Sequence, residues 1–166
     1  MQIVMKRSEN MFRLLWLSRP LMQRVEDLVR RNLEHTGLTV RMRAVLEILE
    51  AHRALSVPDI GRALQIQRQY VQVMVNEVIA AGFAEKRANP RHRASPLIGL
   101  IPQGRDLIRE VLAQEQRKAG QLCEPYTDEE ITAALSVVER LCTQLDSDAD
   151  ATRTDQGKQR DEKGRE

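Results

Sequence analysis

Glutamine and asparagine side chains gather in one stretch of the chain, QIQRQYVQVMVNEVIAAGF at residues 65–83. The apolar residues of this stretch recur at helical spacing, which leaves the opposite side of the helix to polar side chains. A carboxamide carries no charge but offers both a hydrogen-bond donor and an acceptor, so it can pair with the edge of a nucleic-acid base. The stretch supplies these candidates for DNA contact: Gln67, Arg68, Gln69, Gln72, Val73 and Asn76.

Each of these residue types matches a particular base edge in the major groove. Gln and Asn can form two hydrogen bonds with adenine, Arg can do the same with guanine, and Val73 suits a thymine methyl group. The alternative is a solvated polar face that contacts no ligand. The turn before the stretch and the basic segment after it favour base reading over that alternative.

Positive charge is concentrated around the same stretch. The formal net charge of the 166 residues is +2, but six basic residues against two acidic ones lie between positions 62 and 93. Such a surplus indicates contact with DNA phosphates, although a solvated surface would also explain it. The six basic residues are Arg62, Arg68, Lys86, Arg87, Arg91 and Arg93.

Capping residues and apolar periodicity place the helices that must position these side chains. Ser18 and Pro20 predict the start of a long helix, preceded by a separate or kinked helical turn over 9–17. Thr39 and Ser56 predict the N-caps of the next two helices. The second of these is short and ends in a tight turn before the glutamine-rich helix. A composition rich in Leu, Val, Ile, Ala and Met, with only 3% aromatic residues, also favours a mainly α fold.

The periodicity changes after the glutamine-rich helix, which Gly82 ends with a left-handed C-cap. The segments FAEKR at 83–87 and PLIGLI at 96–101 flank a polar, basic connector, which predicts a two-stranded hairpin. Further helices begin near Pro102 and at Thr127. Two short helices joined by a tight turn and followed by a hairpin are the elements of a winged helix-turn-helix.

The segments GLTVRMRAVLEIL, SVPDIGRALQIQRQYVQVMVNEVIAAGFAEK and NPRHRASPLIGLIPQG resemble the MarR family of transcriptional regulators. The resemblance implies a mainly α fold with a small β-hairpin, in which flanking dimerisation helices surround the winged helix-turn-helix. It also implies a homodimer that binds a palindromic operator in double-stranded DNA and responds to a small-molecule effector. The second hypothesis is a winged-helix module that binds a protein partner and no longer reads bases.

The resemblance assigns DNA contacts to two elements of this chain. The recognition helix would be Gln67–Ala81 and the wing Phe83–Ile101. In the wing, Arg91, His92 and Arg93 are the candidate contacts. The family usually has an Asp and, two residues later, the minor-groove Arg where this chain has His92 and Ala94. Arg91 and Arg93 are therefore rival candidates for the minor-groove contact, and Arg93 is expected to matter more.

An apolar row in the last helix has nearly coiled-coil spacing, which predicts a subunit interface. Its members are Ile131, Leu135, Val138, Cys142 and Leu145.

The chain is expected to comprise four segments. The expected segments are an N-terminal dimerisation segment (1–36), the winged domain (37–104), C-terminal dimerisation helices (105–146) and a disordered tail (147–166).

Other functions lack support in the sequence. Trp16 and Met42 are candidates to line an effector pocket, with ordinary core packing as the alternative. Cys123 and Cys142 fit no metal pattern and are expected to be reduced, partly buried thiols. No metal site, cofactor or enzymatic activity is expected, because nucleophile motifs, phosphate loops and metal-ligand spacing are absent. Neither a bilayer-spanning run nor a signal peptide is apparent, so a cytoplasmic protein without a membrane partner is expected.

Overall fold

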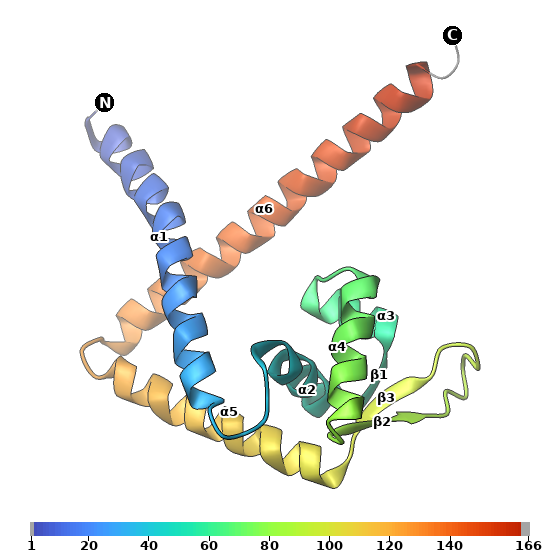
Figure 1. Cartoon of the computed structure of the whole chain (residues 1–166). Helices are drawn as coiled ribbons and strands as arrows, with labels where there is room; N and C mark the ends of the chain where they lie inside the picture. Colours follow the sequence, from blue (N-terminus) through green and yellow to red (C-terminus); the bar gives the residue numbers. More distant parts are fainter. Residues whose placement is uncertain (1, 164–166) are drawn as a thin grey trace. The chain divides into compact units, whose positions relative to one another are not determined.

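The computed structural model describes the backbone of residues 2–163 and the side chains of residues 6–147. The chain divides into two compact units, Met1–Lys118 and Ala119–Glu166. The first unit holds the core and the sheet, and the second holds the end of the fifth helix and the sixth (Figure 1). The elements in chain order are α1 (Gln2–Asn32), α2 (Val40–His52), β1 (Ala54–Ser56), α3 (Val57–Leu64), α4 (Arg68–Ala80), β2 (Ala84–Arg87), β3 (Leu97–Leu100), α5 (Pro102–Cys123) and α6 (Asp128–Lys163).

Three predicted N-caps are confirmed by their hydrogen bonds. Thr39 and Ser56 each accept a bond from the backbone N–H three residues later, which begins α2 and α3. At the start of α6, the Glu130 N–H donates to Thr127 Oγ1 over 3.2 Å, and the Thr127 N–H donates to Glu130 Oε2 over 2.9 Å. This reciprocal pair is a capping box, which satisfies two N–H groups that the helix leaves without partners.

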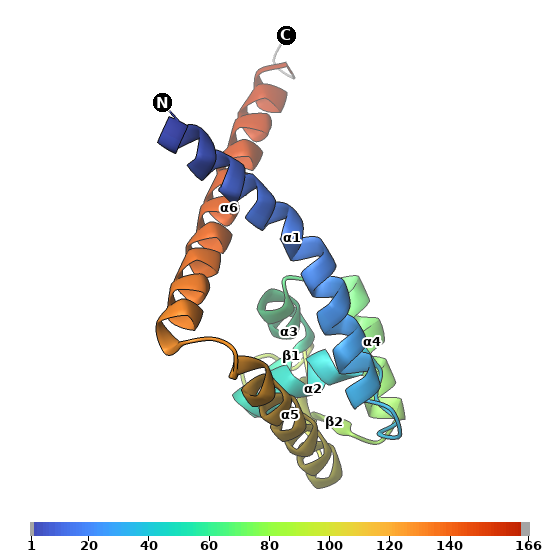
Figure 2. The ribbon, with the colours of Figure 1, turned by 90° about the vertical axis from the view of Figure 1, so that its left-hand side faces the viewer.

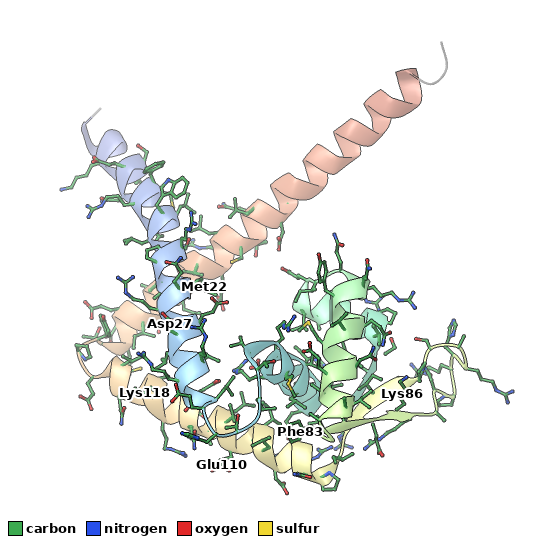
Figure 3. The ribbon with its side chains drawn as sticks, viewed as in Figure 1. Met22, Asp27, Phe83, Lys86, Glu110 and Lys118 are labelled. Carbon is green, nitrogen blue, oxygen red and sulfur yellow. The ribbon has the colours of Figure 1, made fainter. Side chains whose placement is uncertain are left out.

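The end of α4 determines how the chain enters the wing. Gly82 has a φ of +74°, the left-handed conformation that the sequence predicts there. The Phe83 N–H donates to the Val78 carbonyl and the Gly82 N–H donates to the Ile79 carbonyl, each over 3.0 Å. These two bonds form a Schellman motif. Figure 3 labels Phe83 where α4 passes into β2, with Lys86 farther along that strand.

The first helix differs from its prediction, because α1 is continuous through Pro20. The separate or kinked turn over 9–17 is therefore wrong. Ser18 does not cap a new helix: its hydroxyl donates to the carbonyl of Leu15 within α1. A proline inside a helix removes one N–H donor, and the surrounding Leu, Met and Arg residues are good helix formers that continue the helix across it.

The sheet has three strands rather than the predicted two, in the order β1-β3-β2 with antiparallel pairing. In β3, Ile98 pairs with Leu55 of β1 on one side and with Lys86 of β2 on the other. The sequence analysis missed β1 because it is only three residues long and directly follows a helix. Its pairing partner lies more than 40 residues away, so short-range periodicity carries no signal for it.

One hydrophobic core joins α2, α3, α4, β3 and α5. The predicted buried face of α4 is confirmed, since Val71, Val75 and Val78 are fully buried and Met74 nearly so. Figures 1 and 2 show α2, α3 and α4 gathered around this core. Burial of each large side chain stabilises the fold by about 1.5–3 kcal/mol. The largest fully buried residues outside α4 are Val45, Leu46, Leu49, Ile60, Ile98, Leu100, Ile108 and Val111.

Ion pairs hold α5 against α2. The guanidinium of Arg43 donates to Glu115, and both side chains are mostly buried. The hydrogen bonds that Arg43 donates to Glu115 are the main reason that the pKa of Arg43 is raised, which keeps the guanidinium charged. Glu50 accepts from Arg109 over 2.5 Å and lies 3.4 Å from Arg105. The two clusters fix α5 to the winged domain at positions two to three helical turns apart.

One prediction about the last segment differs from the structure. The backbone of α6 continues to Lys163, so the expected boundary between helix and disordered tail at 146 has no counterpart. No proline interrupts the sequence after Pro125, which lets the helix continue. Residues 164–166 of that segment lie outside the described residues. In the part of the chain that the structure describes, no helix is both long and apolar enough to cross a lipid bilayer.

Candidate nucleic-acid interface

A tight turn sets α4 against α3. Gln65 adopts a left-handed conformation with a φ of +54°, and its N–H donates to the Arg62 carbonyl over 3.3 Å. The Ile66 N–H donates to the Gly61 carbonyl over 3.0 Å. A Cβ on Gly61 would lie 3.1 Å from the Ile66 carbonyl oxygen, so a small residue permits this close approach. The turn brings α4 to the surface as the second helix of a helix-turn-helix.

The predicted recognition helix extends one residue farther at each end than α4. Gln67 is the N-cap, but its side chain makes no capping bond, so its amide is not engaged by the helix. Arg68, Gln69 and Asn76 are exposed, Val73 is 49% exposed, and Gln72 is half-buried. The residues that the glutamine pattern singled out therefore lie on the solvent side of α4, away from the core.

Tyr70 is an exposed residue of α4 that the sequence analysis missed. Its side chain is 65% exposed, beside the face that carries Val73. On the same flank, Glu77 forms a 3.3 Å ion pair with Arg41 of α2. The signal was available, because position 70 falls outside the spacing of the buried residues. An exposed tyrosine offers both a stacking surface and a hydroxyl for a phosphate.

An open cleft of about 730 Å³ lies between the start of α3, β1 and the wing. It brings together predicted contacts from two elements, since Arg68 of α4 lines it together with Arg91 and His92 of the wing. Arg93 is exposed but does not line this cleft. Arg62 also lines it and is partly neutralised by an ion pair with Asp59. The cleft is therefore basic, as a surface that faces phosphates should be.

The Asp59 carboxylate is held in its charged form. The hydroxyl of Ser56 donates to it over 2.5 Å, and this hydrogen bond is the main reason that the pKa of Asp59 is lowered from its ordinary value of 3.8. The positive charge of Arg62 lowers that pKa further. Ser56 thus caps α3 and fixes the carboxylate on the cleft wall at the same time.

Asn89 organises the wing loop that carries the predicted arginines. Its amide donates to the Ser95 carbonyl over 2.8 Å, and its side-chain oxygen accepts from the Arg91 N–H over 3.1 Å. The Ser95 N–H also donates to the His92 carbonyl over 3.0 Å. The sequence analysis missed Asn89, although an Asn-Pro pair is a recognisable turn signal. These bonds shape the loop and leave the three basic side chains exposed.

Arg87 has a structural role in the wing. Its guanidinium donates to the Leu100 carbonyl over 2.9 Å and to Glu85 over 3.0 Å. It lies over Gly99, where a Cβ would come within 2.7 Å of the Arg87 Cζ. Arg87 was counted in the basic surplus of the sequence, but its guanidinium is engaged within the hairpin by these bonds.

The two candidate effector residues differ in burial. Met42 is 6% exposed and belongs to the core, whereas Trp16 is 61% exposed on α1 and contacts Phe12 edge to face, with 5.8 Å between ring centroids. A separate hollow of about 480 Å³ lies between the end of α1 and the start of α2, and neither residue lines it. Its lining consists of Arg30, Leu33, Glu34, Leu38, Thr39, Val40 and Arg41.

The cysteines also differ from their prediction. Cys123 and Cys142 are exposed rather than partly buried. Both belong to the second unit, whose side chains in the described part bury no core of their own. Among the described residues, no group of three or more His, Cys, Asp and Glu side chains is placed to hold a metal ion.

Comparison with known protein sequences places the winged domain among related domains. Residues 36–95 match the MarR family. Uncharacterized proteins of Mycobacterium bovis and Mycobacterium tuberculosis are each 35% identical to this chain over 91 residues, which is 55% of this chain. The chain spans 61% of the length of those relatives.

Solved structures share the fold over most of the chain. The crystal structure of a MarR family transcription regulator has a TM-score of 0.79 and 32% identity, and the match covers 86% of this chain and 93% of that one. A cysteine-to-serine mutant of MarR from E. coli, complexed with operator DNA, has a TM-score of 0.71 at 16% identity, covering 77% and 92%. The S. aureus MepR–DNA complex has a TM-score of 0.72 at 18% identity, covering 78% and 96%. The winged helix-turn-helix with flanking helices is therefore the fold of this chain.

Proposed function

We propose that this chain, which belongs to the MarR family of transcription regulators, binds a two-fold symmetric DNA operator as a homodimer. In each subunit α4 would enter the major groove and read bases, while the wing would contact the adjacent minor groove. Members of this family are transcription regulators and not enzymes, so DNA binding is the activity to test. Related proteins of the same fold have been crystallised with DNA, which supports the proposal.

The observation that carries this proposal is the joining of two surfaces. The polar face of α4 continues directly into the basic cleft, because Arg68 belongs to both. Base reading needs neutral donors and acceptors, and affinity needs positive charge beside them. Gln69 and Gln72 would supply the donors and acceptors, and the wing residues Arg91 and Arg93 would supply the positive charge. Figure 1 shows the loop between β2 and β3 at the outer end of the hairpin.

Exposed apolar side chains on α1 and α6 support a dimer. Phe12, Trp16 and Leu21 on α1, and Leu135 on α6, are each more than half exposed. Apolar side chains at helical spacing on the surface of a single chain mark a surface that another chain can cover. Two-fold symmetry would place the two copies of α4 about 34–36 Å apart, one turn of DNA.

Response to a small-molecule effector belongs to the same proposal. The hollow lined by Leu33, Leu38 and Val40 lies between a flanking helix and the winged domain, so a ligand there would contact both. Arg30 and Arg41 on its lining are each ion-paired, with Asp27 and Glu77, and Glu34 also lines it, so the apolar residues favour a ligand with an apolar body. Such a ligand changes operator affinity only if it binds the DNA-bound and free conformations with different affinity.

Selection of bound fragments from random duplex DNA tests the proposal directly. A regulator should recover a palindrome whose half-sites are about one helical turn apart. Gln69→Ala and Gln72→Ala should each weaken binding to that palindrome by about 1–3 kcal/mol and weaken binding to random DNA far less. Recovery of no sequence above background would instead favour a winged-helix module that binds a protein partner.

A further inference from the structure

Gln72 and Asn76 lie one helical turn apart on α4 and form a side-chain pair. The Nε2 amide of Gln72 donates a hydrogen bond to Oδ1 of Asn76 over 3.0 Å. Gln72 is half-buried and Asn76 is exposed, so the pair runs from the flank of the helix toward its outermost face. Gln69, by contrast, makes no side-chain hydrogen bond to any residue in the described part of the chain.

This hydrogen bond leaves the two amides with different functional groups. One N–H of Gln72 is taken, and the same planar carboxamide keeps its second N–H and its Oε1. A neighbouring donor and acceptor of this kind complement N7 and the N6 amino group of adenine. The carbonyl of Asn76 is already engaged, so its remaining groups are chiefly the two Nδ2 donors. Gln72 is thus equipped to read adenine, and Asn76 is not equipped in the same way.

We propose that Asn76 is a positioning residue that fixes the carboxamide of Gln72 so that Gln72 reads an adenine in the operator. This inference rests on the proposed function. A free glutamine can rotate its terminal amide and present the donor and acceptor in either order. In the observed bond Asn76 accepts, which holds the Gln72 amide in place before DNA arrives with its carbonyl left for the base. This reduces the conformational freedom that is lost on binding.

A double-mutant cycle measures whether Asn76 acts through Gln72. Gln72→Ala, Asn76→Ala and the double variant are titrated with the selected operator and with duplexes in which each base pair is changed in turn. Gln72→Ala should lose a roughly five- to hundredfold preference for adenine at one base pair. Asn76→Ala should weaken binding roughly two- to tenfold and reduce the preference at that same base pair. The double variant should bind no worse than Gln72→Ala.

Two further variants separate positioning from direct contact. Combined with Asn76→Ala, the control Gln69→Ala should give additive losses, because Gln69 has no bond to Asn76. Asn76→Asp keeps an acceptor for Gln72, so it should preserve the adenine preference while its negative charge weakens binding to every DNA. All of these positions are on the surface of α4, and alanine is a good helix former, so folding should be retained.

The same measurements contain the results that would overturn the assignment. If Asn76→Ala changes the preference at a different base pair, or if its loss adds fully to that of Gln72→Ala, then Asn76 contacts DNA independently. Loss of the adenine preference in Asn76→Asp would also contradict the positioning role. A wild-type protein that selects no sequence would overturn the proposed function, and this assignment with it.

Discussion

Gly104→Ala should destabilise the protein although alanine is the better helix former. Gly104 lies in the first turn of α5, and a Cβ there would lie 2.1 Å from the carbonyl oxygen of Phe83. A normal contact needs at least 3 Å, so the two segments must separate by about 1 Å. That oxygen accepts the Ile101 N–H over 3.1 Å, and the Phe83 N–H closes the C-cap of α4. The strain therefore falls on two hydrogen bonds at once.

The expected loss in the free energy of unfolding of Gly104→Ala follows from those two hydrogen bonds. At about 1 kcal/mol each they represent about 2 kcal/mol, within the range for an overpacked site. Gly120→Ala in the same helix is the matched control, since nothing lies within 4 Å of a Cβ there. It should leave stability unchanged or raise it by up to about 1 kcal/mol. Both are measured by urea unfolding at one protein concentration, because the stability of the proposed dimer would depend on concentration.

Operator affinity provides the second measurement for these glycine variants. Phe83 begins the wing, so its displacement in Gly104→Ala should also weaken binding to the selected operator, whereas Gly120→Ala should bind normally. If Gly104→Ala unfolds at the same urea concentration as the wild type, then the start of α5 has room to move away from Phe83. The contact would in that case place no constraint on the wing.

Three further predictions concern the wing, the dimer and the cleft. Arg93→Ala should reduce operator affinity more than Arg91→Ala, whose main effect should be a shallower salt dependence; unchanged affinity and salt slope in both would remove the wing from the interface. Leu135→Asp combined with Val138→Asp should sediment as monomers or aggregates and lose operator binding, and a double variant that remains a DNA-binding dimer would refute the interface. The lowered pKa of Asp59 contributes stability that is fully present above its ordinary value of 3.8 and is lost as the pH falls through the lower folded value. The urea midpoint of Asp59→Asn should therefore fall less than that of the wild type between about pH 5 and about pH 2, and parallel curves would contradict this.

Local signals in the sequence were sufficient for most of the helical fold. The caps at Thr39, Ser56 and Thr127 and the left-handed residue Gly82 depend on residues close in sequence, so spacing alone predicts them. The same local reasoning located the buried face of α4. It failed at Pro20, where good helix formers on both sides outweighed the missing N–H donor.

Features that depend on distant residues were beyond that reasoning. Strand β1 exists because β3, more than 40 residues away, pairs with it. The charge of Arg87 looked available for DNA until its bonds to Leu100 and Glu85 were known. Trp16 and Met42 are both apolar, and nothing in their spacing distinguishes an exposed position from a core position.

Gly99 and Arg87 have a consequence for how new members of this fold could arise or be engineered. The two strands of the hairpin are joined by a guanidinium that leaves no room for a side chain at position 99. A side chain at position 99 would displace the Arg87 guanidinium from this place and with it the bond to Leu100, whereas residues 88–95 lie between the strands and are mostly exposed. The loop can therefore vary in sequence while Arg87 and Gly99 keep the two strands of the hairpin together. Loops of equal length from other winged regulators should be accepted by graft while the helices and the core remain unaltered, so groove preference could diversify independently of folding.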